Sequence, residues 1–355
     1  MTGRSGSSHR DFGVFLPVAN GGWIISSTTP PLDGLWKQNL AAAIAAEDAG
    51  LDFVMSMGKW RGFGGETNHW GTSLESVTLM AAIAQATSRI KVWATVHPLL
   101  QNPAVAAKMI ATLDHISGGR AGLNIVAGAY QAEFDQMGAW DEALDHDDRY
   151  ALAEEWTALV KRLWSEPSVT HQGRFFRMTD CVSDPKPLSQ PRPDLICAGM
   201  SERGFRFAVR EADACFIGGH TADERRDASR RAHALAAEFG RTIKTYAMCT
   251  VVHAGADAAA EALVDRYRAG VDMGAVIEML KHWGVPPERL AETAERQGAF
   301  MTQTVVGSPA TCREQIEAFL DHGELDGLML IFPDYVEGLA MFGAEVLPAL
   351  RQVAA

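Results

Sequence analysis

The stretch 124–150, NIVAGAYQAEFDQMGAWDEALDHDDRY, carries the strongest indication of the fold. It starts in an apolar strand that holds one amide side chain, Asn124, and then supplies a glycine and the acid Glu133. An acidic loop follows and ends in Arg149 and Tyr150. Polar groups directly after a parallel strand are typical of the active-site end of a barrel. The stretch therefore predicts a barrel strand together with part of a functional site.

Outward from this stretch, short apolar runs alternate with longer amphipathic ones along the whole chain. Strands are expected at 12–18, 53–56, 91–96, 122–127, 194–198, 214–217, 246–252 and 327–332. Helices are expected at 35–49, 73–87, 104–116, 150–164, 202–211, 222–239, 256–269 and 309–320. Most of the strand runs are continuously apolar, which suits strands buried on both faces. Eight strands alternating with eight helices predict an α/β fold, a (β/α)8 TIM barrel.

A doubly wound open sheet is the alternative fold. It favours a glycine-rich phosphate loop of the form GxGxxG after the first strand. The corresponding segment here, PVANGGW at 17–23, does not have that form.

Residues 11–355 are expected to form a single barrel domain after a flexible arm at 1–10, with insertions on the carboxyl-terminal face. One insertion, at about 171–190, is rich in proline, aspartate and aromatic residues, which predicts a hairpin or long loop before the fifth strand. The other, at about 271–302, has helix-like pieces broken by Pro286 and Pro287. Insertions at the active-site end of a barrel often form lids, so we expect one here.

Composition narrows the class of partner. The 355 residues carry a net charge of −12, which argues against nucleic acid, because phosphate backbones require a basic face. The five cysteines have no CxxC pair, which predicts free thiols in a reducing, cytoplasmic compartment. Cys and His show no metal-ligand spacing, so no metal is expected. No leader-like run and no apolar run of about 18 residues occurs, which predicts that there is no membrane partner. A small-molecule substrate is expected from the polar strand ends described next.

The third and fourth expected strands end in polar side chains. Thr95 and His97 lie two residues apart and so face the same side of one strand. Asn124 on the next strand is expected to face the same interior. A hydroxyl beside an amide suits hydrogen bonding to a heterocycle and polarising dioxygen. For His97 a satisfied core histidine is the alternative to a pocket donor or acid–base group.

Two loops offer groups for a larger ligand. The loop after the second strand, MSMGKWRGFGG, contains Gly58, Lys59 and Arg61, where solvated loop charges are the alternative to ligand contacts. The fifth strand is followed by Met200 and by Ser201, which is placed to cap a helix. Free N–H groups at a helix start can bind phosphate, although a serine cap is also common without one.

Taken together, several runs resemble the bacterial-luciferase-like family of flavin-dependent monooxygenases. The run NPAVAAKMIATLDHISGGRAGLNIVAG (102–128) is characteristic of that family. Further runs resemble the pyrimidine monooxygenases within it, which open the uracil ring: GGWIIS (21–26), RGFGG (61–65), LESVTLMA (74–81), EFDQMG (133–138) and ICAGMSERG (196–204). The resemblance covers almost the whole chain.

The resemblance implies a two-component monooxygenase that receives reduced FMN (FMNH2) from a separate NAD(P)H-dependent flavin reductase. Such enzymes use dioxygen to form a flavin peroxide that attacks an amide-like carbonyl of an N-heterocycle and opens the ring. Thr95 and Asn124 match the pair expected to position dioxygen, with His97 as a third catalytic candidate. The implied FMN contacts are Gly58, Lys59, Asn124, Glu133, Arg149, Tyr150, Met200 and Ser201. By analogy with related barrels a homo-oligomer is expected.

The chain also departs from the pyrimidine enzymes. They have a glycine–tryptophan step where this chain has Gly128, Ala129 and Tyr130, and the His97–Pro98 step is closer to oxygenases of sulfur compounds. An oxygenase of a sulfone or sulfonate is therefore a second hypothesis. A flavin- or deazaflavin-dependent reductase or binding protein is a third.

Overall fold

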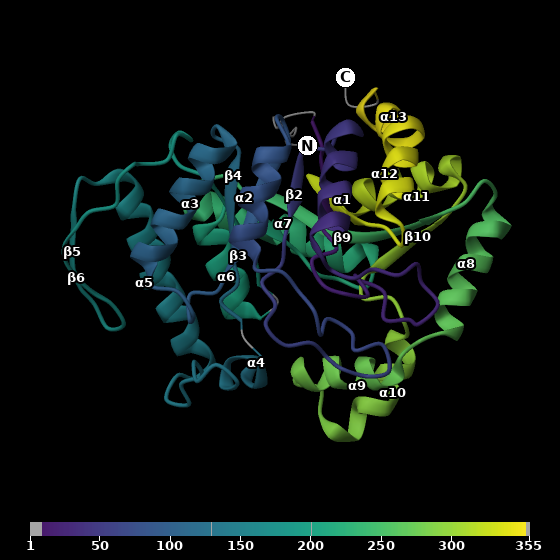
Figure 1. Cartoon of the computed structure of the whole chain (residues 1–355), viewed down its shortest axis with the longest axis horizontal. Helices are drawn as coiled ribbons and strands as arrows, with labels where there is room; N and C mark the ends of the chain where they lie inside the picture. The colour runs from purple at the N-terminus through teal and green to yellow at the C-terminus, as the bar shows by residue number, and fades with distance from the viewer. Residues whose placement is uncertain (1–8, 129, 200, 353–355) are drawn as a thin grey trace.

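The computed structural model describes residues 9–128, 130–199 and 201–352, and these form a closed parallel barrel (Figure 1). The barrel strands are β1 (Asp11–Phe15), β2 (Phe53–Met55), β3 (Lys91–Val96), β4 (Ala121–Ile125), β7 (Asp194–Ala198), β8 (Ala214–Phe216), β9 (Lys244–His253) and β11 (Gly327–Ile331). They pair in this order, all parallel, and the β11–β1 pairing closes the ring. The predicted (β/α)8 barrel is confirmed, since all eight expected runs are barrel strands.

The eight expected helices are also present and surround the barrel (Figure 1). They are α1 (Trp36–Asp48), α2 (Ser76–Ala86), α3 (Pro103–Ser117), α5 (His146–Ser165), α6 (Glu202–Glu211), α7 (Ala222–Glu238), α8 (Asp257–Ala269) and α11 (Pro309–Gly323). Local signals explain their ends. Asn102 caps α3 ahead of a proline, and Gly118 closes it in the left-handed conformation. At the end of the chain, α12 (Tyr335–Met341), the π-helical turn Phe342–Val346 and α13 (Leu347–Gln352) complete the outer layer.

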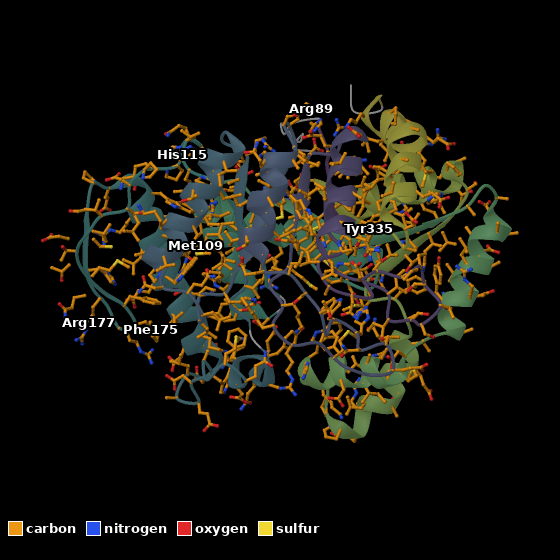
Figure 2. The ribbon with its side chains drawn as sticks, viewed as in Figure 1. Arg89, Met109, His115, Phe175, Arg177 and Tyr335 are labelled. Atoms are coloured by element: carbon orange, nitrogen blue, oxygen red, sulfur yellow. The ribbon has the colours of Figure 1, made fainter. Side chains whose placement is uncertain are left out.

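The segment predicted as a hairpin or loop contains an antiparallel pair, β5 (Val169–Gln172) and β6 (Arg177–Cys181). It belongs to the connection from α5 to β7 and lies outside α5 (Figure 1). Figure 2 shows Phe175 and Arg177 at the outer edge of the molecule. The hairpin therefore lies away from the end of the barrel where the strands terminate.

The second predicted insertion holds α9 (Met273–His282), the short 3-10 helix Pro287–Arg289 and α10 (Leu290–Gln297). Together with α4 (Gln131–Asp135), which follows β4, these helices lie at the lower edge in Figure 1. Because α4 follows a barrel strand directly, this edge is the carboxyl-terminal end of the barrel.

One strand was not expected. β10 (Gln303–Gly307) pairs in parallel with the last five residues of β9, from Cys249 to His253. β9 is ten residues long and outlasts its neighbour β8, which pairs only with Lys244–Tyr246. The exposed end of β9 thus accepts an extra strand. Among the described helices, none has the length and apolar character needed to cross a membrane.

Stacked aromatic side chains fill the amino-terminal half of the barrel interior. The rings of Phe53 and Trp93 stack with centroids 3.9 Å apart, and Tyr246 stacks on Phe53 at 5.6 Å. Since β9 does not neighbour β2 or β3, these contacts cross the interior. Glycines make room for the rings: a Cβ at Gly13 would lie 2.2 Å from Phe53, and one at Gly122 would lie 2.2 Å from Trp93.

This packing predicts that Gly122→Ala destabilises the protein. The new methyl group overlaps the Trp93 ring, and overpacking of a core costs about 1–3 kcal/mol of unfolding free energy. Urea unfolding followed by circular dichroism measures the change. Gly255→Ala is the matched control, since that position is exposed and a Cβ there meets nothing within 4 Å. Equal unfolding midpoints for the two variants would contradict the assignment of Gly122 as a packing position.

Candidate functional site

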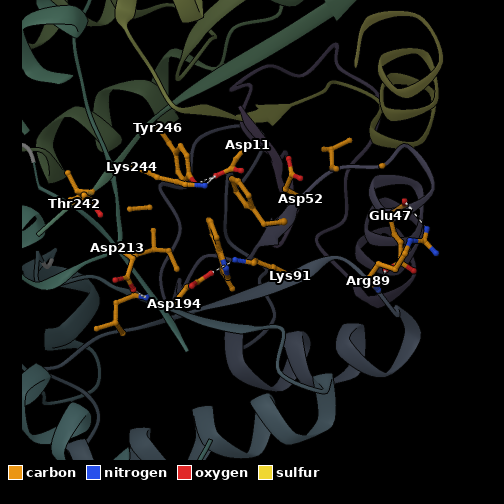
Figure 3. Close-up of a pocket in the computed structure, with 18 of the residues that line it drawn as sticks. Asp11, Glu47, Asp52, Arg89, Lys91, Asp194, Asp213, Thr242, Lys244 and Tyr246 are labelled. Carbon is orange, nitrogen blue, oxygen red and sulfur yellow. Dashed lines mark hydrogen bonds and ion pairs between the residues drawn. The ribbon is translucent and has the colours of Figure 1, made fainter. Parts of the chain in front are cut away.

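A cavity of about 730 Å³ opens at the amino-terminal end of the barrel (Figure 3). Several of its charged groups pair with one another. Lys91 lies 2.7 Å from Asp194, and Asp11 accepts hydrogen bonds from Lys244 at 2.5 Å and from the Tyr246 hydroxyl. Paired charges at this end of a barrel serve stability, whereas chemistry occurs at the opposite end. The candidate site is therefore sought where the strands terminate.

At the carboxyl-terminal end, one buried carboxylate holds the loop that follows β2. Glu133 on α4 is 2% exposed and forms an ion pair with Lys59, with 3.1 Å between Nζ and Oε2. Its other oxygen accepts the main-chain N–H groups of Trp60 at 2.5 Å and Arg61 at 3.3 Å. Three donors on one carboxylate fix the Gly58–Arg61 segment against α4. The sequence pattern indicated both partners but not that they form a pair.

Aromatic rings surround the Lys59 ammonium group. Its Nζ lies 4.3 Å from the ring centroid of Tyr130, 4.9 Å from that of Phe63 and 5.8 Å from that of Trp70. Burial lowers the pKa of Lys59, and the charge of Glu133 opposes that shift. The ring faces attract a cation and exclude water, so the ion pair lies in an apolar, dry environment.

Thr95 and Asn124 are brought together as expected. The Asn124 Nδ2 group donates to Thr95 Oγ1 at 2.9 Å, and Thr95 Oγ1 in turn donates to the Ser56 carbonyl at 2.5 Å. Asn124 Oδ1 is buried and has no hydrogen-bond partner among the described residues. Buried amide oxygens are normally paired, so an unpaired one beside a strand end indicates a place for a ligand.

His97 lies next to this pair, and its Nε2 is 3.2 Å from the Gly58 carbonyl. A carbonyl only accepts, so the ring hydrogen is on Nε2. Burial lowers the pKa of His97. The carbonyls of Gly58 and Val126 and the charge of Glu133 favour the protonated ring and reduce this shift without reversing it. The ring is therefore neutral near pH 7 and ties β3 to the loop after β2.

A second group of predicted residues lies at the start of α6. Ser201 caps that helix by accepting the Gly204 N–H at 3.0 Å. A Cβ at Gly204 would lie only 2.3 Å from the Tyr150 hydroxyl and 3.1 Å from Ser201 Oγ, so both side chains converge on this glycine. Burial raises the pKa of Tyr150, and its hydrogen bond to Ser201 opposes this. Two hydroxyls beside free helix N–H groups suit a phosphate.

Arg149, by contrast, lies in the first turn of α5 and contacts the loop that precedes this helix. Its Nη1 donates to the Leu144 carbonyl at 2.9 Å, and its guanidinium group lies 4.9 Å from the Trp140 ring centroid. It closes the acidic loop that precedes α5.

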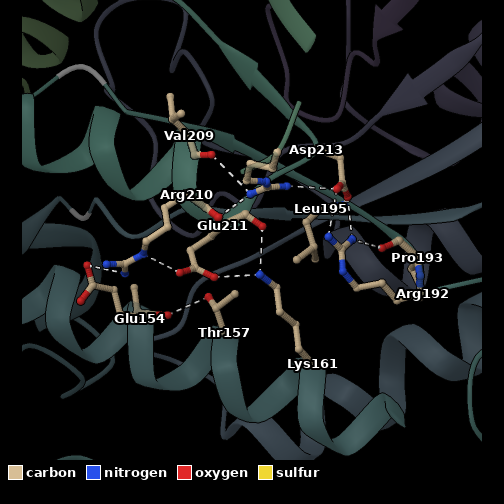
Figure 4. A network of polar contacts seen from close by, with 12 residues as sticks. Glu154, Thr157, Lys161, Arg192, Pro193, Leu195, Val209, Arg210, Glu211 and Asp213 are labelled. Atoms are coloured by element: carbon tan, nitrogen blue, oxygen red, sulfur yellow. Dashed lines mark hydrogen bonds and ion pairs between the residues drawn. The ribbon is translucent and has the colours of Figure 1, made fainter. Parts of the chain in front are cut away.

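An ion-pair network holds α5 and α6 together (Figure 4). Glu154 on α5 binds Arg203 and also Arg210 at 2.8 Å, while Lys161 binds Glu211 at 2.8 Å. Tyr150 near the start of α5 and the cap of α6 are therefore kept in register. The network explains how residues about 50 positions apart in sequence form one cradle.

The expected lid is attached to the site at several points. Residues 271 and 300 form bridges with the loop after β1, and Asp272 accepts the Thr67 N–H at 2.7 Å. Trp283 after α9 donates from Nε1 to the Tyr130 hydroxyl at 2.6 Å. Burial raises the pKa of Tyr130 to about 12, so this hydroxyl keeps its hydrogen. The insertion thus contacts both the β2 loop and the β4 loop.

The predicted residues fall into two clusters, one around the ends of β3 and β4 and one at the starts of α5 and α6. Thr95, His97, Asn124, Gly58, Lys59 and Glu133 form the first, and Arg149, Tyr150 and Ser201 lie in the second region. Met200 lies outside the described residues, and so does Ala129, which is in the loop after β4 where this chain departs from the pyrimidine enzymes.

Sequence reasoning missed Ser56, Ser76 and His69. His69 is fully buried, neither ring nitrogen has a partner among the described residues, and burial lowers its pKa to about 4. Its place in an aromatic, glycine-rich loop was the only available signal. Ser56 was recognised only as the last residue of a strand.

The Lys59–Glu133 pair predicts a strong coupling in stability. Glu133→Gln leaves a buried ammonium group without its counter-charge, which costs about 3–5 kcal/mol of unfolding free energy. Lys59→Met together with Glu133→Gln removes both charges and is expected to recover most of that loss. Denaturant unfolding of Glu133→Gln, Lys59→Met and the double variant measures the coupling.

Glu278→Gln is the control, since Glu278 pairs with Lys281 on an exposed helix face and is expected to change stability by about 0.5 kcal/mol at most. An additive loss in the double variant at 59 and 133 would show that the two charges do not depend on each other.

Comparison with known proteins agrees with the geometry. A model of the luciferase-like monooxygenase family matches residues 10–323. The pyrimidine monooxygenase RutA of Variovorax paradoxus strain S110 is 35% identical over 349 residues, covering 96% of this chain and 94% of the relative. The protein of the same name from Bradyrhizobium sp. strain BTAi1 is 35% identical over 355 residues, covering 97% and 98%.

Solved structures share the fold. A riboflavin lyase, solved with modified FMN and riboflavin, aligns with a TM-score of 0.84 at 23% identity over 97% of this chain and 92% of its own. DmoA from Hyphomicrobium sulfonivorans aligns with a TM-score of 0.83 at 20% identity over 97% and 88%. The family match spans most of the chain and the relatives align nearly end to end. The chain therefore belongs to the luciferase-like monooxygenase family.

Proposed function

We propose that this protein is a two-component monooxygenase that uses reduced FMN and dioxygen to oxygenate and open a pyrimidine-like ring containing an amide. The observation that carries the proposal is the unpaired, buried Asn124 Oδ1 beside Thr95, at the end of the barrel where two loops and a lid converge. The names of the curated relatives support the substrate class.

The residues present fit FMN. The cradle of Tyr150, Ser201 and the α6 start suits the phosphate group, and Asn124 offers an acceptor for the ring system. Gly58 lies beside Thr95, and the Lys59–Glu133 pair fixes the loop that carries this glycine. Gly58, Lys59 and Glu133 would form one wall of the flavin site. When bound, reduced FMN supplies the electrons that activate dioxygen, which amino-acid side chains cannot do.

The chain's own contribution is positioning and exclusion of water. Thr95 and Asn124 hold polar atoms toward the reacting centre, and the rings around Lys59 keep that region dry. His97 is neutral and donates from Nε2 to the Gly58 carbonyl, which holds the loop after β2 beside Thr95 and Asn124. It remains the third catalytic candidate. Met200, adjacent to Ser201, and Arg149, adjacent to Tyr150, complete the proposed FMN contacts.

The proposal includes a separate NAD(P)H-dependent flavin reductase, since FMN must arrive reduced. A cytoplasmic location, a homo-oligomer and a single barrel domain over 11–355 are also proposed. The five described cysteines are free thiols, which supports a reducing compartment.

Single-turnover oxidation tests the activity. The protein is loaded anaerobically with reduced FMN, mixed with aerated buffer containing uracil or dimethyl sulfone, and the products are read by mass spectrometry. We expect an oxygenated, ring-opened product from uracil and unchanged dimethyl sulfone. Asn124→Ala is expected to lower the product yield about 10²-fold or more, since one preorganised polar contact is removed. Oxygenation of the sulfone alone would favour the sulfur-compound hypothesis, and no binding of reduced FMN would exclude both.

The phosphate cradle predicts a ligand-specific effect of Ser201→Ala. Loss of one hydroxyl is expected to weaken FMN binding about tenfold, the equivalent of a single hydrogen bond to a charged group. Riboflavin, which lacks the phosphate, is expected to bind the variant as it binds the wild type.

Ser308→Ala is the matched control, because Ser308 caps α11 in the same way. It removes a cap without changing FMN affinity. Equal losses for FMN and riboflavin in Ser201→Ala would place the phosphate elsewhere.

A further inference from the structure

The hydrogen-bond chain that ends at Asn124 has a direction set by a main-chain carbonyl. The Ser56 carbonyl can only accept, so the hydroxyl hydrogen of Thr95, whose oxygen lies 2.5 Å away, points to it. A threonine hydroxyl has one hydrogen, so toward Asn124 it can only accept. The Asn124 atom 2.9 Å from Thr95 Oγ1 must therefore be the amide nitrogen.

The opposite atom of the amide, Oδ1, is consequently turned away from Thr95. It is buried, and no described residue donates to it. Leaving a buried acceptor unpaired destabilises the protein, so its natural partner is a donor on a ligand.

We propose that Asn124 Oδ1 selects a ligand that presents an N–H group, and that Thr95, anchored by Ser56 and Ser76, is the positioning residue that keeps this acceptor exposed to the ligand. The inference rests on the proposed function. Reduction adds an N–H group to the isoalloxazine ring at N5, and a pyrimidine-like lactam carries N–H groups, whereas a sulfone carries none.

Ser76 anchors Thr95 through its main chain. Ser76, the first residue of α2, accepts the Thr95 N–H at 2.7 Å and shares a hydrogen bond with Ser56 Oγ at 2.6 Å. The strand end that carries Thr95 is thus tied to the start of a helix and to the neighbouring strand. Without the hydrogen bond from Thr95 N–H to Ser76, the Thr95 hydroxyl loses its fixed direction. The amide of Asn124 can then turn by about 180°, which exchanges the positions of Oδ1 and Nδ2.

Thr95→Val and Thr95→Ser test the direction of the chain. Valine keeps the shape and loses the hydroxyl, while serine keeps it. The ratio of the dissociation constants for oxidised and reduced FMN is measured anaerobically, and KM and kcat are measured with uracil. In Thr95→Val we expect a change of about tenfold either in the ratio of the dissociation constants or in the KM for uracil. In Thr95→Ser we expect a change of about twofold at most in either quantity.

A weakened preference for reduced FMN identifies the flavin as the N–H donor. A raised KM for uracil at unchanged FMN preference identifies the substrate as the donor. If neither quantity moves in Thr95→Val, the proposal is overturned.

Ser76→Ala should shift the same quantity in the same direction as Thr95→Val. Ser229→Ala is its matched control, because Ser229 is also buried and bonded to a threonine, Thr245, but at the start of β9. Both serine variants are expected to lower the melting temperature. If Ser76→Ala lowers only the melting temperature, as the control does, Ser76 has no positioning role.

A flavin-free measurement separates this inference from the proposed function. The side-chain amide resonances of Asn124, assigned by their loss in Asn124→Ser, are followed by hydrogen exchange in the free protein. The hydrogen donated to Thr95 is expected to exchange slowly in the wild type and at least about tenfold faster in Thr95→Val, as expected from losing one hydrogen bond. If the wild type binds no FMN, the proposed function fails, while this difference still supports the anchored amide. Equal exchange in both proteins overturns it.

Discussion

Closure of the barrel imposes the constraint from which the rest of the structure follows. Every second residue of each strand points into one enclosed interior. The side chains at these positions must therefore fill the interior without overlapping and without leaving gaps. Phe53, Trp93 and Tyr246 fill the amino-terminal half, and glycines on neighbouring strands accommodate them. One step further along the strands, Thr95 and Asn124 face the same interior. The aromatic layer thus closes the amino-terminal side of the interior, and the polar groups pack on its other side.

At the carboxyl-terminal end of the barrel, main-chain carbonyls determine which way the polar side chains face. The Ser56 carbonyl directs Thr95, and the Gly58 carbonyl directs His97. Both carbonyls belong to the segment that follows β2, and Glu133 on α4 holds that segment in place. The orientation of donors and acceptors in the site is therefore a property of the backbone, which costs no reorganisation when a ligand arrives.

The barrel could be predicted from sequence because its signals are local. Apolar runs at 53–56 or 91–96 identify strands without knowledge of their neighbours. The candidate residues at strand ends could also be predicted, since Thr95 and Asn124 break otherwise apolar runs. Ser76 could not be found in this way. It opens a helix, and its contact with Thr95 depends on how that helix returns to the sheet. β10 was missed because it pairs with the surplus length of β9, which is visible only once the lengths of both neighbours are known.

The buried pair of Lys59 and Glu133 also has a consequence for how this chain can diverge over time. Each partner alone tolerates a neutral replacement poorly, because the other would keep a buried charge without its counter-charge. A single substitution that removes one of the two charges gives a less stable protein. The second charge must then be removed soon afterwards, or both must change together. In descendants of this sequence, positions 59 and 133 should therefore change together or persist together, although 74 residues separate them along the chain.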